Sequence, residues 1–212
     1  MQTMALRMRR KGIQVFIIAP LKGHEFYRAA RNVGGEFIQI SPASKNCINI
    51  MEIRKVDNSV NELLDGPTLD ASALAGKIQR LHIFFSLLIP DMSHEEKQLL
   101  DEALIKTYAR KGITHKNESL TDPQHPEQYK KMPILEDVYN VLLESEDTKR
   151  LAHILNRLVH GSASSFNQQT NVDLTNKYTV LDISELTGSS DLLTVGMFVA
   201  LDYVCLLYTS PS

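Results

Sequence analysis

Two sets of polar residues in the sequence are candidates for chemistry: Glu25, and the run Gln168, Gln169 and Thr170. Glu25 follows the apolar run 13–18. Open α/β sheets bind ligands beyond the carboxyl ends of their strands, so a carboxylate there could polarise a water molecule or reach a nucleotide held by a neighbouring subunit. The alternative is a solvated carboxylate in the first turn of a helix, which the helix dipole favours.

The run 168–170 precedes a second apolar run, 178–183, and its amide and hydroxyl groups could sense the terminal phosphate of a nucleotide or contact DNA. Residues of these types also stabilise turns, so a purely structural role is an equal alternative. Asp182 interrupts the apolar run 178–183. Because a buried carboxylate is costly without a partner, we expect Asp182 either at the edge of the sheet or in a functional role, and favour a structural one.

Metal chemistry is not predicted. The seven histidines and two cysteines show neither His-x-x-x-His nor Cys-x-x-Cys spacing, so we expect no metal site. Two isolated thiols indicate a reducing cytoplasm rather than a disulfide framework. The net charge of −2 gives no global field that favours nucleic acid or an anionic membrane. The longest apolar run, 83–89, is too short to span a bilayer, so no transmembrane segment is expected.

The elements that must position these residues alternate between helix and strand at both ends of the chain. Residues 2–11 and 25–32 predict helices, and 13–18 and 36–40 predict strands, which is the rhythm of an α/β sheet. Four helical stretches follow, at 72–89, from Ser93 onward, at 133–143 with Pro133 in its first turn, and at 147–160. A strand at 178–183 and a helix at 192–204 then restore the α/β pattern.

This order predicts an α/β domain interrupted by a helical insertion. Residues 1–55 form the first part of the α/β core, 56–160 the insertion, and 161–204 the return to the core. The strands near 13–18, 36–40 and 178–183 should therefore be neighbours in one parallel sheet, although the insertion separates the last two.

Four segments carry a resemblance to a known family. They are Gln14-Val-Phe-Ile-Ile-Ala-Pro20 with Gly23-His-Glu-Phe26, Gly34-Gly-Glu-Phe-Ile-Gln-Ile-Ser-Pro42 with Cys47-Ile-Asn-Ile50, Phe166-Asn-Gln-Gln-Thr-Asn-Val-Asp-Leu174, and Leu181-Asp-Ile-Ser-Glu-Leu186 with Met197-Phe-Val-Ala-Leu201. In this order and spacing they resemble the conjugative-transfer ATPases of type IV secretion systems, the VirB-four type. The first strand departs from the family pattern, since Ala19 stands where the family usually has an acidic residue.

The resemblance implies a RecA-like P-loop ATPase core with an all-helical insertion, truncated at both ends. The phosphate-binding pattern Gly-x-x-x-x-Gly-Lys-Ser/Thr does not occur in the sequence; by resemblance it should lie just before Met1, and the acidic Walker B strand after Val204. The intact protein would use ATP and Mg²⁺ to drive conjugative DNA or protein transfer, whereas this fragment would be inactive and bind no nucleotide.

By the same resemblance, the protein would form a homo-oligomer, a hexamer, and contact membrane secretion-channel components and DNA from the cytoplasmic face of the membrane. Two alternatives remain. One is a DNA-translocating or DNA-processing P-loop ATPase of the same superfamily, and the other is a non-enzymatic helical interaction module supported by its α/β flanks.

Residues 205–212 (Cys-Leu-Leu-Tyr-Thr-Ser-Pro-Ser) are predicted not to be native sequence. The octapeptide can be back-translated onto a transposase adapter of sequencing libraries, and a flexible native tail rarely opens with an apolar run. The alternative is a natural disordered C-terminus. Amplification of the source DNA across this junction should give a different sequence after Val204; a native gene that encodes Cys205 to Ser212 followed by a stop codon would refute the prediction.

Overall fold

The computed structural model of the chain describes residues 2–42, 44–54, 72–173 and 175–208, with side chains to 204. Its centre is a three-stranded parallel sheet with strand order β1-β3-β2, formed by β1 (Val15–Ala19), β2 (Glu36–Gln39) and β3 (Tyr178–Asp182). Val15 pairs with Tyr178, and Glu36 pairs with Thr179. The predicted joining of the three strands in one parallel sheet is confirmed, with the last strand in the middle.

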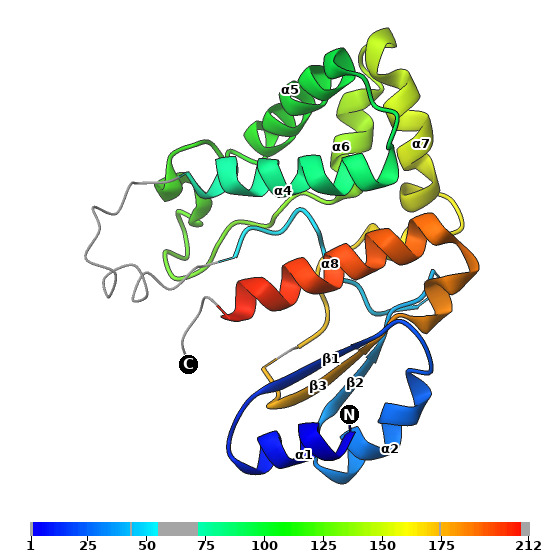
Figure 1. Cartoon of the computed structure of the whole chain (residues 1–212). Helices are drawn as coiled ribbons and strands as arrows, with labels where there is room; N and C mark the ends of the chain where they lie inside the picture. Colours follow the sequence, from blue (N-terminus) through cyan, green and yellow to red (C-terminus); the bar gives the residue numbers. More distant parts are fainter. Residues whose placement is uncertain (1, 43, 55–71, 174, 209–212) are drawn as a thin grey trace.

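Alternation along the strands divides the apolar side chains between the two faces of the sheet. On one face Val15, Tyr178 and Val180 pack against α1 (Gln2–Arg10) and α2 (His24–Asn32). On the other face Ile38 and Leu181 join the larger apolar cluster that contains α8 (Ser190–Tyr208) and the helical part. Figure 1 shows α1 and α2 on one side of the sheet and α8 on the other.

Glycine ends α1 as the sequence predicts. Gly12 has φ of +81°, the left-handed conformation that closes a helix, and its amide donates to the Arg9 carbonyl at 3.0 Å. The three arginines in the last turn of α1 lie where the helix dipole favours cations. The chain then turns directly into β1.

The helical part consists of α4 (Ala73–Leu88), α5 (His94–Arg110), α6 (Leu135–Leu142) and α7 (Lys149–Val159), with short 3-10 turns η1 (Asn117–Leu120) and η2 (Glu146–Thr148). The predicted capping box is present: Ser93 Oγ accepts from Glu96 N at 3.1 Å, and Glu96 Oε2 accepts from Ser93 N at 2.8 Å. The predicted start of the insertion at residue 56 lies outside the described residues.

The predicted place of Pro133 in the first turn of a helix is wrong. Helix α6 begins at Leu135, because the Asp137 carboxylate accepts from the Ile134 amide at 2.9 Å and caps the helix there. Pro133 lies before the cap, and its carbonyl accepts a hydrogen bond from the Asn49 side chain at 2.9 Å.

Two more 3-10 turns, η3 (Ser164–Phe166) and η4 (Ser184–Gly188), flank β3 and lead into α8. Helix α8 extends past the predicted end of native sequence to Tyr208. Within the described part of the chain, no helix is both long enough and apolar enough to traverse a bilayer.

A buried ionic contact joins α4 to α8. The Lys77 ammonium, 5% exposed, donates to the Ile50 carbonyl at 3.0 Å and to Asp202 Oδ2 at 3.3 Å. Arg80 donates to the other oxygen of Asp202 at 3.2 Å. Burial lowers the pKa of Lys77, and the carboxylate of Asp202 opposes that shift. This contact therefore ties the helical part, the segment after β2 and the α/β core together.

Replacing Asp202 by alanine should lower the free energy of unfolding by roughly 3–5 kcal/mol, because Lys77 would be left as a buried, unpaired cation. The double variant Lys77→Met/Asp202→Leu should recover much of that loss. Urea unfolding would measure both, with the exposed Asp147→Ala as a control expected to change stability by less than about 0.5 kcal/mol. Equal effects of Asp202→Ala and Asp147→Ala would contradict the prediction.

Candidate functional site

The carboxyl ends of β1 and β3 form a topological switch point. From β1 the chain continues to α2 on one face of the sheet, whereas from β3 it continues through η4 to α8 on the opposite face. Connections that diverge in this way leave a crevice between the strand ends, which is where open α/β sheets bind ligands. We therefore take this edge as the candidate functional site.

The backbone of the β1–α2 turn is unusual at this point. Lys22 has φ of +53° and is the single non-glycine residue with positive φ among those the structure describes. A side chain in this conformation is uncommon and costs on the order of 1 kcal/mol or more. The conformation brings Gly23 directly against β3.

The Asp182 side chain closes the crevice. A Cβ atom placed on Gly23 would lie 2.0 Å from the Asp182 carboxylate, so only glycine fits there. Asp182 is 3% exposed, and its Oδ1 accepts from the Ser184 amide at 3.0 Å. Of the two alternatives for Asp182, a place in an edge strand is wrong, because β3 is the central strand. Its burial is tolerated because the carboxylate lies at the strand's end, where the next turn offers an amide donor.

Glu25 lies in the first turn of α2, close to this edge. Its carboxylate is exposed and pairs with Lys22 at 3.9 Å, with both side chains more than half exposed. Such an exposed pair contributes little to stability. The carboxylate is therefore accessible, as a role toward a ligand or a neighbouring subunit would require.

A cavity of about 200 Å³ lies beside the switch point, between the end of α7 and the turn after β3. Arg157 and Glu185 line it from opposite elements; Arg157 donates to Ser189 Oγ at 3.2 Å, and Gln39 donates to Glu185 Oε1 at 3.4 Å. Its charged groups are thus already held by neighbouring side chains.

Gln168, Gln169 and Thr170 do not meet Glu25. They contact the segment after β2 and the segment before α6. Gln169 Nε2 donates to the Met132 carbonyl at 2.7 Å, and the Gln168 carbonyl accepts from the Cys47 thiol at 3.3 Å. Thr170 Oγ1 accepts from the Asn49 amide at 2.9 Å and donates to Glu52. These contacts favour the structural interpretation of the run.

Asn49 is the central residue of this network, although its sequence context marks it only as part of a motif. It is 3% exposed; its side chain donates to Pro133 O and accepts from the Met51 amide at 3.0 Å. Burial also raises the pKa of the Cys47 thiol to about 11. The sequence signal for this junction is a polar asparagine among apolar neighbours, since such a residue needs hydrogen-bond partners once it is buried.

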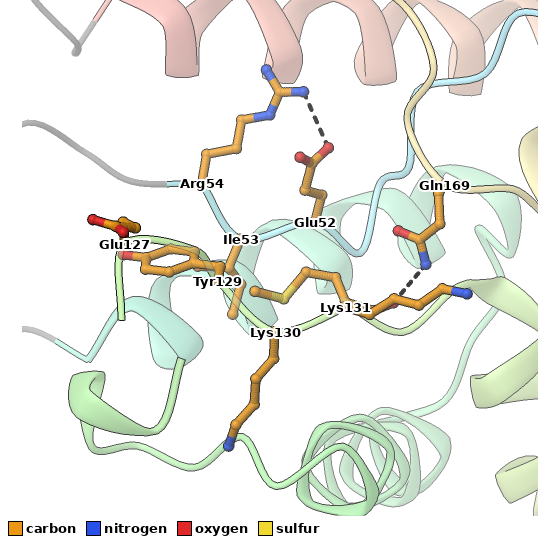
Figure 2. A pocket seen from close by; sticks show the side chains of 9 residues that line it. Glu52, Ile53, Arg54, Glu127, Tyr129, Lys130, Lys131 and Gln169 are labelled. Carbon is orange, nitrogen blue, oxygen red and sulfur yellow. Dashed lines mark hydrogen bonds and ion pairs between the residues drawn. The ribbon is translucent and has the colours of Figure 1, made fainter. Parts of the chain in front are cut away.

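A pocket of about 440 Å³ adjoins the same network, between residues 52–54 and the loop 127–132 (Figure 2). Arg54 donates to Glu52 at 3.1 Å, and its guanidinium carbon lies 3.4 Å from the centre of the Tyr203 ring. Figure 2 shows Lys130 and Lys131 extending away from Glu52, and Lys130 donates to the Gly112 carbonyl at 2.7 Å. The basic groups that line this pocket are largely used within the protein.

The β1–α2 turn is not arranged to hold the phosphates of a nucleotide. A phosphate loop presents a row of backbone amides to the phosphates, whereas in this turn the Asp182 carboxylate occupies the space over Gly23. Within the described residues, no group of three histidine, cysteine or carboxylate side chains is placed to hold a metal ion.

No protein-family model and no curated protein matches the sequence. Among solved structures the chain is similar to VirB4 of Thermoanaerobacter pseudethanolicus, with 24% identity and a TM-score of 0.78 over 97% of this chain and 73% of that chain. At this identity the likeness establishes the fold, and it confirms the α/β class predicted from the sequence. The four sequence segments resemble the same VirB-four type.

Substituting Gly23 by alanine should lower the free energy of unfolding by about 1–3 kcal/mol, because the new methyl group would meet the Asp182 carboxylate. In the double variant Gly23→Ala/Asp182→Ala the two losses should not add, and urea unfolding should give a coupling of about 1 kcal/mol. The matched control is Gly76→Ala in α4, where a Cβ meets no atom within 4 Å and should stabilise the helix. A Gly23→Ala variant as stable as the wild type would contradict this account.

Proposed function

We propose that this chain is part of an ATP-hydrolysing motor that energises DNA or protein transfer through a type IV secretion system. The observation that carries the proposal is the fold shared with VirB4 over 97% of the chain. The substrate-moving role rests on the sequence resemblance and on this likeness together.

The way the resembling segments come together supports the proposal. Segments that are far apart in the sequence form neighbouring strands: β1 and β2 both pair with β3. The second and third segments are hydrogen-bonded through Cys47 N to Asn171 Oδ1 at 2.7 Å and through Asn49 N to Thr170 Oγ1. The family-like residues thus form one connected framework around the switch point.

In this proposal the chain supplies the framework and Glu25, while the phosphate-binding loop and the magnesium-binding strand belong to sequence outside it. ATP and Mg²⁺ would be cofactors of the intact protein. Its partners would be further copies of itself in a hexamer, components of the secretion channel, and DNA. Its location would be peripheral, at the cytoplasmic face of the membrane.

Of the alternatives, a free-standing helical interaction module is the less favoured. One continuous apolar cluster extends from α4 through α8 to Leu181 in the sheet, and Asp202 and Asn49 add polar contacts across the same boundary. A helical part removed from the core would expose this surface to water. A DNA-translocating or DNA-processing ATPase of the same superfamily shares the fold argument and differs only in the substrate moved.

The proposal predicts no magnesium-dependent ATP hydrolysis by the 212-residue chain, and activity in a longer chain that includes the missing phosphate loop and acidic strand. In that longer chain, Glu25→Gln should lower kcat by about 100-fold if its carboxylate orients the attacking water. The control Glu36→Gln, an exposed carboxylate at the opposite end of the sheet, should leave kcat unchanged. Hydrolysis by the 212-residue chain that disappears in Glu25→Ala would overturn the proposal.

A further inference from the structure

Charge is unevenly distributed along this chain. Residues 1–40 contain seven of the 23 basic residues but two of the 25 acidic ones, a net charge of +5, and the remainder carries −7. The overall charge of −2 conceals this separation. Segregation of this kind creates a local positive field that a mean value does not reveal.

The fold gathers the positive charge on one surface. Helices α1 and α2 lie on the same face of the sheet, and Gln2 Nε2 donates to the Glu25 carbonyl at 2.9 Å, which places their first turns together. Ala5 and Ala30 point into the apolar layer beneath them. The exposed cations of the two helices and the turn after α1 point the opposite way, and we call them the basic face: Arg7, Arg10, Lys11, Arg28 and Arg31.

The basic face is not neutralised within the part of the chain that the structure describes. Counting only pairs between described residues, the one ion pair that involves residues 2–40 is Lys22 with Glu25, outside the basic face. Arg31 donates to the Tyr27 hydroxyl at 3.1 Å and lies over its ring, and neither contact supplies a negative charge. Unpaired cations that point into solvent are available to an external anion.

The helix dipole accounts for only part of this arrangement. The dipole favours Arg7 and Arg10 in the last turn of α1 and Arg31 in the last turn of α2, although α4 and α6 end without any basic residue in their last turns. Arg28 lies in the middle of α2, where the dipole has little effect.

Exposed apolar side chains border the basic face. Of the seven large hydrophobic residues that are exposed in the described chain, four lie between residues 4 and 27: Met4 at 63%, Ile13 at 45%, Leu21 at 69% and Tyr27 at 43%. Met4 lies on the β1 side, where it lines a groove with Val15, and Tyr27 lies on the β2 side, where its ring meets Phe37 edge-on at 5.2 Å.

This combination distinguishes between two anionic partners. The phosphate backbone of a nucleic acid would use the arginines but leave the aliphatic side chains without a partner. The surface of a bilayer offers anionic headgroups to cations and an interfacial layer to apolar and aromatic side chains. We infer that the outer face of α1 and α2 binds the anionic surface of a lipid bilayer, with the basic face on the headgroups and Met4, Ile13 and Tyr27 at its borders.

This inference deepens the proposed peripheral location by assigning it a surface, and it does not require ATP hydrolysis. The test is co-sedimentation of the 212-residue chain with vesicles of phosphatidylcholine, with and without about one third phosphatidylglycerol. We expect binding to the anionic vesicles that weakens as salt rises. Equal binding to both kinds of vesicle would overturn the inference.

The variant Arg7→Gln/Arg28→Gln should weaken binding to anionic vesicles by at least about tenfold, since each cation near such a surface contributes about fivefold. The matched control is Lys97→Gln/Lys116→Gln, two exposed cations of the helical part, which should bind as the wild type does. Met4→Ser/Ile13→Ser should reduce the vesicle binding that remains at about 0.5 M salt, where the charges are screened. The reason is that these substitutions remove apolar area that would be buried at the interface.

Two other results would assign the basic face to a different partner and overturn the inference. One is weaker binding of Arg7→Gln/Arg28→Gln to a DNA duplex with unchanged vesicle binding. The other is that Arg7→Gln/Arg28→Gln loses a self-association that the wild type shows in sedimentation velocity, while neither the wild type nor the variant binds vesicles. A longer chain could hydrolyse ATP while its vesicle binding is unchanged by substitution of Arg7 and Arg28. That result would overturn this inference alone and leave the proposed function standing.

Discussion

The parallel pairing of β3 with both β1 and β2 is the constraint on which the rest of the structure depends. The two strands that come first in the chain do not pair with each other, and the strand that joins them follows the whole helical part. All five residues of β3 are buried, so its insertion completes the apolar layers on both faces at once. Because this pairing is highly non-local, its entropic cost must be offset by the packing that the completed sheet makes possible.

The helical part is held to the sheet where the chain leaves the core and where it returns. At these crossings the backbone belongs to neither helix nor sheet, so side chains satisfy its polar groups: Asn49, Thr170 and Asn171 do so in both directions. The Lys77–Asp202 contact adds a third attachment through α4 and α8. The side chains of Gln169 and Thr170, candidates for ligand binding in the sequence, form hydrogen bonds across this junction.

The same topology shapes the functional edge. Divergence of the chain after β1 and β3 opens a crevice, and Asp182 fills it so closely that Gly23 can carry no side chain. What remains accessible is Glu25 on one side and a small charged cavity on the other. On the outer surface, the arginines of α1 and α2 form a positively charged face that is separate from this edge. The remainder of the chain carries a net negative charge.

The sequence by itself determined the local elements, because they follow from short-range signals: the β-branched runs of the strands, the Ser93–Glu96 capping box, and Gly12 at a helix end. It also indicated a parallel sheet, since α/β alternation resumes after the helical part. Only the tertiary structure decided the order of the strands, the burial of Asp182 in the central one and the hydrogen-bond partners of Gln169 and Thr170. Those features depend on which distant segments meet, and a side chain's partner across a hundred residues leaves no pattern in its own neighbourhood.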